Sequence, residues 1–235
     1  MKLRRIKAVY KKQFYDKTSL RSMLFQSLIY PLMAIMFSIS GDESEKLLMV
    51  STLTPMFVGS SPMLTVNNLV REDKNGGSLR ALMLASVRPL EYITAVALFM
   101  LTVSGITALL MGLAGGIGGI EILYFFAASM LGCLLTVLLA CAVSFRNNNS
   151  ANSIMLINVL SLANGFIPLI GIYYTSATAV TKYWYTQQVK DIMFSIFTGE
   201  TQDLALSFGV MIATLLVFLA LFIISFRKNR IFSQE

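Results

Sequence analysis

Stretches without any charged residue alternate with short charged segments along the chain. Every Lys, Arg, Asp and Glu falls between or outside six such stretches. Each stretch is long enough to cross about 30 Å of hydrocarbon, for which a helix needs about 20 apolar residues. The stretches are Ser22–Gly41, Leu47–Val70, Tyr92–Ile120, Ile122–Phe145, Asn147–Thr181 and Leu204–Phe226. The pattern therefore predicts an all-α integral membrane protein with six transmembrane helices in one domain, residues 22–235.

The first 21 residues follow a different pattern. Apolar side chains recur three or four positions apart, which places them on one helical face, while Lys and Arg occupy much of the remainder. The apolar positions are Leu3, Ile6, Tyr10 and Phe14. A helix of this kind lies in the plane of the membrane interface. We therefore expect residues 1–21 to form an amphipathic interfacial arm, with an ordinary basic tail of incidental periodicity as the alternative.

The distribution of basic residues predicts the orientation in the membrane, because short loops rich in Lys and Arg stay in the cytoplasm. The arm, the link at 71–91, Arg146 and the C-terminal tail hold 16 of the 19 basic residues, and they alternate with the loops that hold the rest. We therefore expect both termini on the cytoplasmic side of a bacterial inner (plasma) membrane. The net charge of +7 is expected to face anionic lipid rather than nucleic acid.

Several kinds of chemistry find no supporting residues in the sequence. There is no His, no G-x-x-x-x-G-K-[ST] phosphate loop, and no carboxylate pair within the charge-free stretches. Cys133 and Cys141 are eight residues apart in one predicted helix, about 12 Å along its axis, which is too far for a disulfide. We therefore expect no catalytic residue, metal site or cofactor on this chain.

The link at residues 71–91 predicts a short helix between the second and third spans. Gly76 and Gly77 end the incoming helix, and Ser78 is a suitable first cap for a new one. An apolar face follows at Leu79, Leu82 and Met83. Such a face on a cytoplasmic helix with few charges is typical of a docking element for another protein. A loop that rests on lipid is the alternative.

The same link resembles a segment of the type-2 ABC transporter permeases, the six-span membrane subunits of ATP-driven exporters. In that family an acidic residue precedes Gly-Thr-Leu-x-x-Leu, and a Leu-Glu pair precedes the third span. The matching positions are Glu72, Gly77, Ser78, Leu79, Leu82, Leu90 and Glu91. Ser86 stands where the family usually has Pro, and Val96 where it usually has Lys. The six spans, the arm and the place of the link extend the resemblance over the whole chain.

The resemblance implies how such a chain would work. Two membrane subunits, identical or related, pair within the lipid, and a separate ABC ATP-binding subunit docks on each. The link would be a coupling helix, with Glu72, Gly77, Ser78, Leu79, Leu82 and Met83 as its ATPase-coupling residues. ATP and Mg²⁺ would be held by the partner subunit, which fits the absence of a phosphate loop here.

Neutral polar residues form stripes on the second and fifth predicted spans. Polar faces avoid lipid, so these stripes should point to protein or to a cavity. Their members are Ser51, Thr54, Ser61, Thr65 and Asn68 on the second span and Asn158, Ser161 and Asn164 on the fifth. One interpretation is hydrogen bonding between helices. The other is a substrate path between the two spans, which is where the resemblance places it.

The longest link on the non-cytoplasmic side, about residues 174–203, has room for one or two short helices. It begins with an aromatic cluster, formed by Tyr173, Tyr174, Tyr183, Trp184 and Tyr185. We expect these rings to anchor the chain at the membrane interface, with a gate as the alternative.

These observations favour the permease subunit of an ABC exporter that moves an amphipathic or apolar substrate, a peptide or a drug, out of the cell. An ion-coupled secondary transporter is one alternative, although it would need charges at membrane depth or an internal repeat. A non-transporting membrane scaffold that holds a cytoplasmic partner is another.

Overall fold

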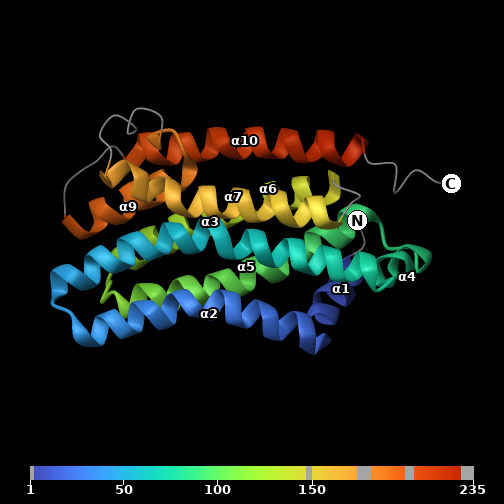
Figure 1. Cartoon of the computed structure of the whole chain (residues 1–235), viewed down its shortest axis with the longest axis horizontal. Helices are drawn as coiled ribbons and strands as arrows, with labels where there is room; N and C mark the ends of the chain where they lie inside the picture. Colours follow the sequence, from blue (N-terminus) through green and yellow to red (C-terminus); the bar gives the residue numbers. More distant parts are fainter. Residues whose placement is uncertain (1–2, 147–149, 174–180, 199–203, 229–235) are drawn as a thin grey trace.

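The computed structural model describes residues 3–146, 150–173, 181–198 and 204–228. The helices in these ranges, in chain order, are α1 (Leu3–Tyr15), α2 (Lys17–Ser40), α3 (Glu43–Asn75), α4 (Ser78–Leu84), α5 (Pro89–Ala114), α6 (Glu121–Arg146), α7 (Ser150–Tyr173), α9 (Tyr185–Thr198) and α10 (Leu204–Lys228). The long helices run along an elongated bundle, with α1 and α4 at one end and α9 at the other (Figure 1). The expectation of an all-helical chain is therefore confirmed for the described residues.

Four of these helices are long and apolar enough to cross a membrane. Their apolar spans are Leu90–Ala114 in α5, Glu121–Ser144 in α6, Asn152–Ile170 in α7 and Leu204–Ile224 in α10. The chain is thus consistent with a multi-pass membrane protein, and four of the six predicted spans meet the requirement. The other two predicted spans correspond to α2, whose apolar part is the shorter Met23–Ile39, and to the more polar α3.

Helix α3 is the central helix of the bundle. It contacts α2, α5, α6, α7 and α9, and most of its side chains between Val50 and Val70 are buried. Polar groups on it are satisfied locally, as where Thr54 Oγ1 donates to the carbonyl of Val50 at 2.7 Å. A helix enclosed by other helices needs no lipid-compatible surface. This enclosure explains why α3 is the most polar of the long helices without being exposed.

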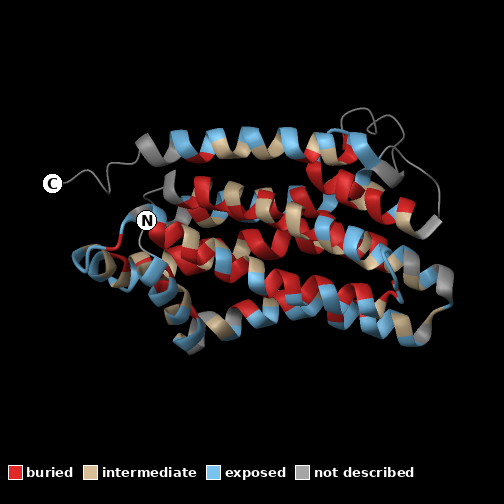
Figure 2. Ribbon diagram, turned by 180° about the vertical axis from the view of Figure 1, so that it is seen from behind, coloured by how far each residue is buried: buried red, intermediate tan, exposed pale blue. Residues whose placement is uncertain are grey.

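Two hydrophobic clusters fill the bundle, one toward each end. The cluster beside α1 and α4 includes Tyr92 and Phe99, and the cluster beside α9 includes Phe57 and Phe125. Figure 2 shows the buried residues on the inward sides of the helices. The outward sides of α2, α7 and α10 carry large exposed apolar side chains, among them Phe25, Leu32, Met36, Met155, Leu162, Leu216 and Ile224. This surface suits contact with lipid tails.

Helix α1 packs against α5 and α2 with a face that differs from the predicted one. Its buried side chains are Ile6, Val9 and Gln13, whereas Leu3 is largely exposed. Packing against α5 and α2, rather than the periodicity of α1 alone, decides which side of α1 is buried. The arm is also shorter than expected, since the chain enters α2 at Lys17.

Helix α9 packs into the bundle against α3, α6, α7 and α10. Tyr185, at its first position, is buried, and its hydroxyl shares a hydrogen bond of 2.9 Å with Thr136 Oγ1 on α6. Thr136 also donates to the carbonyl of Val58 on α3 at 2.7 Å. Tyr185 is therefore a core residue rather than an interface anchor, whereas Tyr183 and Trp184 beside it are exposed.

The described part of the predicted outer link contains this one helix. Residues 174–180 and 199–203 of the link lie outside the described residues, and so do the side chains of Tyr173 and Tyr174.

Candidate functional site

A buried carboxylate, Asp73, organises the end of the bundle that carries α1 and α4. Tyr92 on α5 donates to its Oδ2 at 2.7 Å, and Gln13 on α1 donates to the same oxygen at 3.2 Å. Ser78 at the start of α4 donates to Oδ1 at 2.6 Å. Lys12 on α1 forms an ion pair with Oδ1 and donates to Ser78 Oγ at 3.1 Å. One side chain therefore joins α1, α3, α4 and α5.

The electrostatics of this cluster favour the charged carboxylate. Asp73 is 4% exposed and lies beyond Val70, the last residue of the charge-free stretch. Burial by itself would raise its pKa, but hydrogen bonds from its donors and the charge of Lys12 together hold the pKa below its ordinary value. Asp73 is therefore ionised at neutral pH, and its negative charge strengthens the hydrogen bonds that it accepts.

The local sequence explains why α4 begins beside this carboxylate. Gly76 caps α3 by donating its backbone N–H to the carbonyl of Glu72 at 2.8 Å. Gly77 then adopts φ = 70°, a left-handed conformation that favours glycine. The chain reverses within these two residues, so Ser78 lies next to the end of the helix it has just left.

Two further contacts tie the same end together. Glu91, at the start of α5, is 1% exposed. Its Oε2 accepts a hydrogen bond from the backbone N–H of Arg88 at 3.0 Å. The same oxygen lies 3.7 Å from Nη1 of Arg5 on α1. Lys74 Nζ donates to the carbonyl of Ser144 on α6 at 2.9 Å, and burial lowers the pKa of Lys74. The start of α5 and the end of α6 are thus both connected to this charged end.

Asn67, nearly two helical turns before Asp73 on α3, joins three helices. Its Oδ1 accepts from Ser144 Oγ on α6 at 3.1 Å and from Ser153 Oγ on α7 at 2.9 Å. The sequence pattern did not indicate this residue, nor Asp73, Lys12 or Tyr92. Charged residues at the ends of a span are expected in any membrane protein, so nothing in the pattern separates Asp73 from its neighbours.

The predicted ATPase-coupling residues do come together, but their apolar face points inward. Leu79 is 6% exposed and belongs to the hydrophobic cluster beside α1 and α4, and Leu82 and Met83 pack against that cluster. Glu72 is half-buried. The side of the link that remains accessible consists of Arg80, Ala81, Leu84, Ala85, Ser86 and Arg88, with Leu84 81% exposed. Any protein that docks on α4 would meet this second face.

The predicted path residues of α3 are largely engaged within the chain. Ser61 shares a hydrogen bond of 3.3 Å with Ser27 on α2, and Thr65 Oγ1 donates to Gln26 Oε1 on α2 at 3.0 Å. Ser51 and Thr54 donate to carbonyls of their own helix, and Asn68 is half-buried. These contacts match the interpretation of the α3 stripe as hydrogen bonding between and along helices.

The stripe on α7 divides into a buried and an exposed part. Asn164 is buried, and its Oδ1 accepts from Trp184 Nε1 at 2.9 Å; Ser161 is also buried. A Cβ atom added to Gly59 would lie 2.8 Å from the backbone of Asn164, so α3 and α7 are in direct contact at this level. Asn158 is exposed on the outward side of α7. A path would therefore run outside the α3–α7 contact, along the face that carries Asn158.

Among the described residues there is no group of three or more His, Cys, Asp or Glu side chains placed to hold a metal ion. No protein-family model matches this chain, and no curated protein matches it.

Proposed function

We propose that this chain is the membrane subunit of an ATP-driven exporter of the type-2 ABC permease kind, acting with a separate ATP-binding subunit. The observation that carries the proposal is the attachment of α4. This short helix lies at one end of the bundle between two long helices, and Asp73 ties its first residue to α1, α3 and α5. Hydrolysis of ATP would take place on the partner, for which this chain supplies a rigid contact.

The connections of α4 give a route for force into the membrane. Movement of α4 would act on Asp73 and so on α3, the helix that contacts five further helices besides α4. The partner would meet the accessible face, with Leu84 as its apolar centre and Arg80 and Arg88 beside it. The coupling would also need the buried face of α4 to hold the helix against the bundle. That face is formed by Leu79, Leu82 and Met83.

In this proposal α2 and α3 also cross the membrane, which makes six spans with both termini in the cytoplasm. Helix α2 has 24 residues, a length of about 36 Å at 1.5 Å per residue. Helix α3 is enclosed by its neighbours, so its polar side chains do not face lipid. The basic residues of α1 and of the link lie at the same end of the bundle (Figure 1), which fits a cytoplasmic face.

The substrate path would form between two copies of the chain, identical or related. The exposed faces of α2 and α7 are apolar apart from scattered polar groups such as Asn158. A route lined in this way suits an amphipathic or apolar cargo, and a peptide or a drug fits that description.

The proposal is tested by reconstitution with an ATP-binding subunit. The first candidate is one whose gene lies beside the gene of this chain. We expect the two to copurify and the ATPase rate to rise in proteoliposomes that contain both. Leu84→Asp should abolish that rise, because it places a charge at the centre of the docking face. Leu48→Asp, an exposed leucine at the opposite end, is the matched control and should leave it unchanged. An ATPase rate that is independent of this chain would instead favour a scaffold or a secondary transporter.

A further inference from the structure

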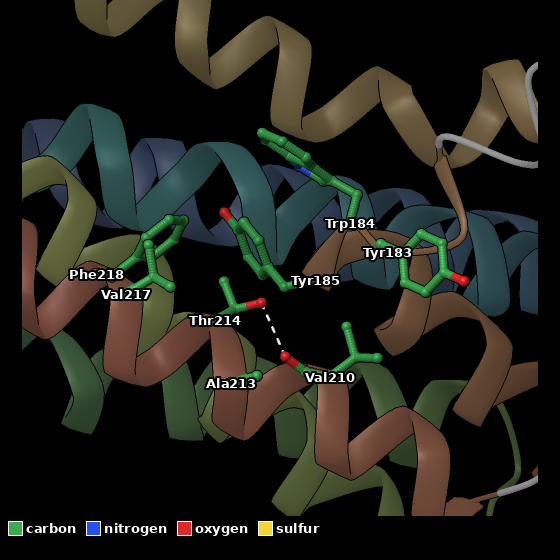
Figure 3. A pocket seen from close by; sticks show the side chains of 8 residues that line it. All are labelled: Tyr183, Trp184, Tyr185, Val210, Ala213, Thr214, Val217 and Phe218. Atoms are coloured by element: carbon green, nitrogen blue, oxygen red, sulfur yellow. Dashed lines mark hydrogen bonds between the residues drawn. The ribbon is translucent and has the colours of Figure 1, made fainter.

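A groove lies between the start of α9 and the side of α10, at the end of the bundle opposite α4. Its volume is about 330 Å³, within the range of small-molecule sites. The side chains that line it are those of Tyr183, Trp184, Tyr185, Val210, Ala213, Thr214, Val217 and Phe218 (Figure 3). Three consecutive aromatic residues form one wall, and one face of α10 forms the other.

Apart from the Tyr183 hydroxyl, the polar side-chain atoms of the lining form hydrogen bonds within the chain. Trp184 Nε1 donates to Asn164 at 2.9 Å, and the Tyr185 hydroxyl bonds with Thr136. Thr214 Oγ1 donates to the carbonyl of its own helix at Val210, at 2.8 Å (Figure 3). The walls therefore offer mainly carbon to a ligand, and they suit an apolar one.

The groove lies at membrane depth. Helix α10 is one of the four candidate spans and the least buried of them. The lining residues on it extend from Val210 to Phe218, about 12 Å along the axis at 1.5 Å per residue. They cover the middle of the span Leu204–Ile224, with Thr214 at its centre. Ala213 and Val217, which line the groove, are themselves exposed, so the groove opens on the lipid-facing side of this span toward the hydrocarbon rather than toward water.

The rim toward α9 has the opposite character. Lys182 is exposed and directly precedes the aromatic wall, and the Tyr183 hydroxyl points away from the other lining side chains (Figure 3). The site thus combines a carbon-lined slot at hydrocarbon depth with a cation and a phenol at its outer end. This sequence of surfaces complements a phospholipid, whose acyl chain and phosphate are arranged in the same order.

We propose that this groove binds one acyl chain of a bilayer phospholipid from the leaflet on the α9 side, with the lipid phosphate next to Lys182. The bound chain would fill the space between α9 and α10 and would support α9 in its position within the bundle. This inference does not rest on the proposed transport function, because it needs only that α10 crosses the bilayer.

The test uses Trp184, which is the one tryptophan of the chain and lines the groove. The purified full chain in detergent is titrated with phosphatidylglycerol brominated on its acyl chain, because bromine quenches indole fluorescence at short range. We expect quenching that saturates at a low lipid mole fraction. Ala213→Phe and, independently, Val217→Phe should remove most of that saturable quenching by filling the slot. Ile212→Phe, at the same depth but outside the groove, should keep it.

A second experiment tests the contact between the lipid headgroup and Lys182. Lys182→Ala should raise several-fold the lipid fraction needed for half-quenching, whereas Lys46→Ala on the same side of the membrane should not. The proposal is overturned by quenching that rises linearly with lipid and equally in every variant, which is the behaviour of ordinary annular lipid. Saturable quenching that survives both groove-filling variants would overturn it as well.

Discussion

Tyr92 and Asp73 stand at the two ends of the α4 link, 19 residues apart, and the tyrosine hydroxyl donates to the carboxylate at 2.7 Å. The bond closes the link into a loop, so the end of α3 and the start of α5 hold each other directly. Both side chains are buried, which protects the bond from competition with water. The segment that contains α4 is therefore fixed at both of its ends by this hydrogen bond.

Tyr92→Phe removes this bond while it keeps the ring in the core. One charge-assisted donor to a buried carboxylate is lost, and we expect the free energy of unfolding to fall by about 1–3 kcal/mol. Thermal or SDS-induced unfolding of the purified chain in detergent measures the change. Tyr183→Phe is the control, because Tyr183 is 67% exposed, and it should unfold like the wild type.

Removal of the carboxylate itself should cost more. Asp73→Ala leaves Lys12, Gln13 and Tyr92 without this acceptor. Because the Lys12 side chain is 30% exposed, we expect a loss of about 3 kcal/mol, the lower end of the range for a buried pair. A double-mutant cycle with Lys12→Met should show strong coupling, since the two residues share one bond. Additive effects in the same unfolding assay would mean that the ion pair does not hold α1 to the link.

Asp73 also predicts a pH dependence. Because its pKa in the folded chain is held below the ordinary 3.8, its contribution to stability is present above about pH 4 and is lost as the pH falls through the folded-state pKa. We expect the difference in stability between wild type and Asp73→Asn to shrink as the pH is lowered from about 4 toward about 3. A difference that stays constant over that range would contradict a charged Asp73.

The close contact of α3 and α7 predicts unequal effects for two helical glycines. Gly59→Ala places a methyl group 2.8 Å from the backbone of Asn164, and we expect it to destabilise the chain by about 1–3 kcal/mol. Gly209→Ala on α10 meets no atom within 4 Å and should be neutral, or stabilising by about 0.5–1 kcal/mol through helix propensity. Equal effects in an unfolding assay would mean that the two helices do not touch at this level.

The two faces of α4 should respond differently to charge. Leu79→Asp buries an unpaired carboxylate in the core and should destabilise the isolated chain by on the order of several kcal/mol. Leu84→Asp should leave the isolated chain as stable as the wild type, because Leu84 is exposed. Stability measured without any partner separates this structural role from the loss of coupling proposed above.

A path between two copies predicts which positions meet water. Asn158→Cys should react with a water-soluble maleimide in reconstituted chain, whereas Ser161→Cys and Ser61→Cys should be protected by burial. The native Cys133 and Cys141 are buried and are replaced beforehand. Leu156→Cys, on the exposed apolar side of α7, is the lipid-facing control, and an Asn158→Cys that is equally inert would argue against the path.

Much of the fold could be predicted from the sequence because its causes are local. Each of the six charge-free runs coincides with the main part of one long helix, and the two glycines followed by Ser78 indicate where α4 begins. Backbone hydrogen bonds within a helix depend on neighbours in the chain, so these features need no knowledge of the rest of the molecule. The length and apolar character of α5, α6, α7 and α10 follow in the same way.

What lies against each helix was decided only by the tertiary structure. A periodic pattern shows that α1 and α4 have apolar sides, but the bundle selects Val9 and Gln13 on one and Leu79 on the other. Asp73 looks like any charge at the end of a span until α1 and α5 bring Lys12 and Tyr92 to it. The energy of a buried carboxylate comes from partners that are distant in sequence, and side-chain patterns along one helix carry no information about which partners arrive.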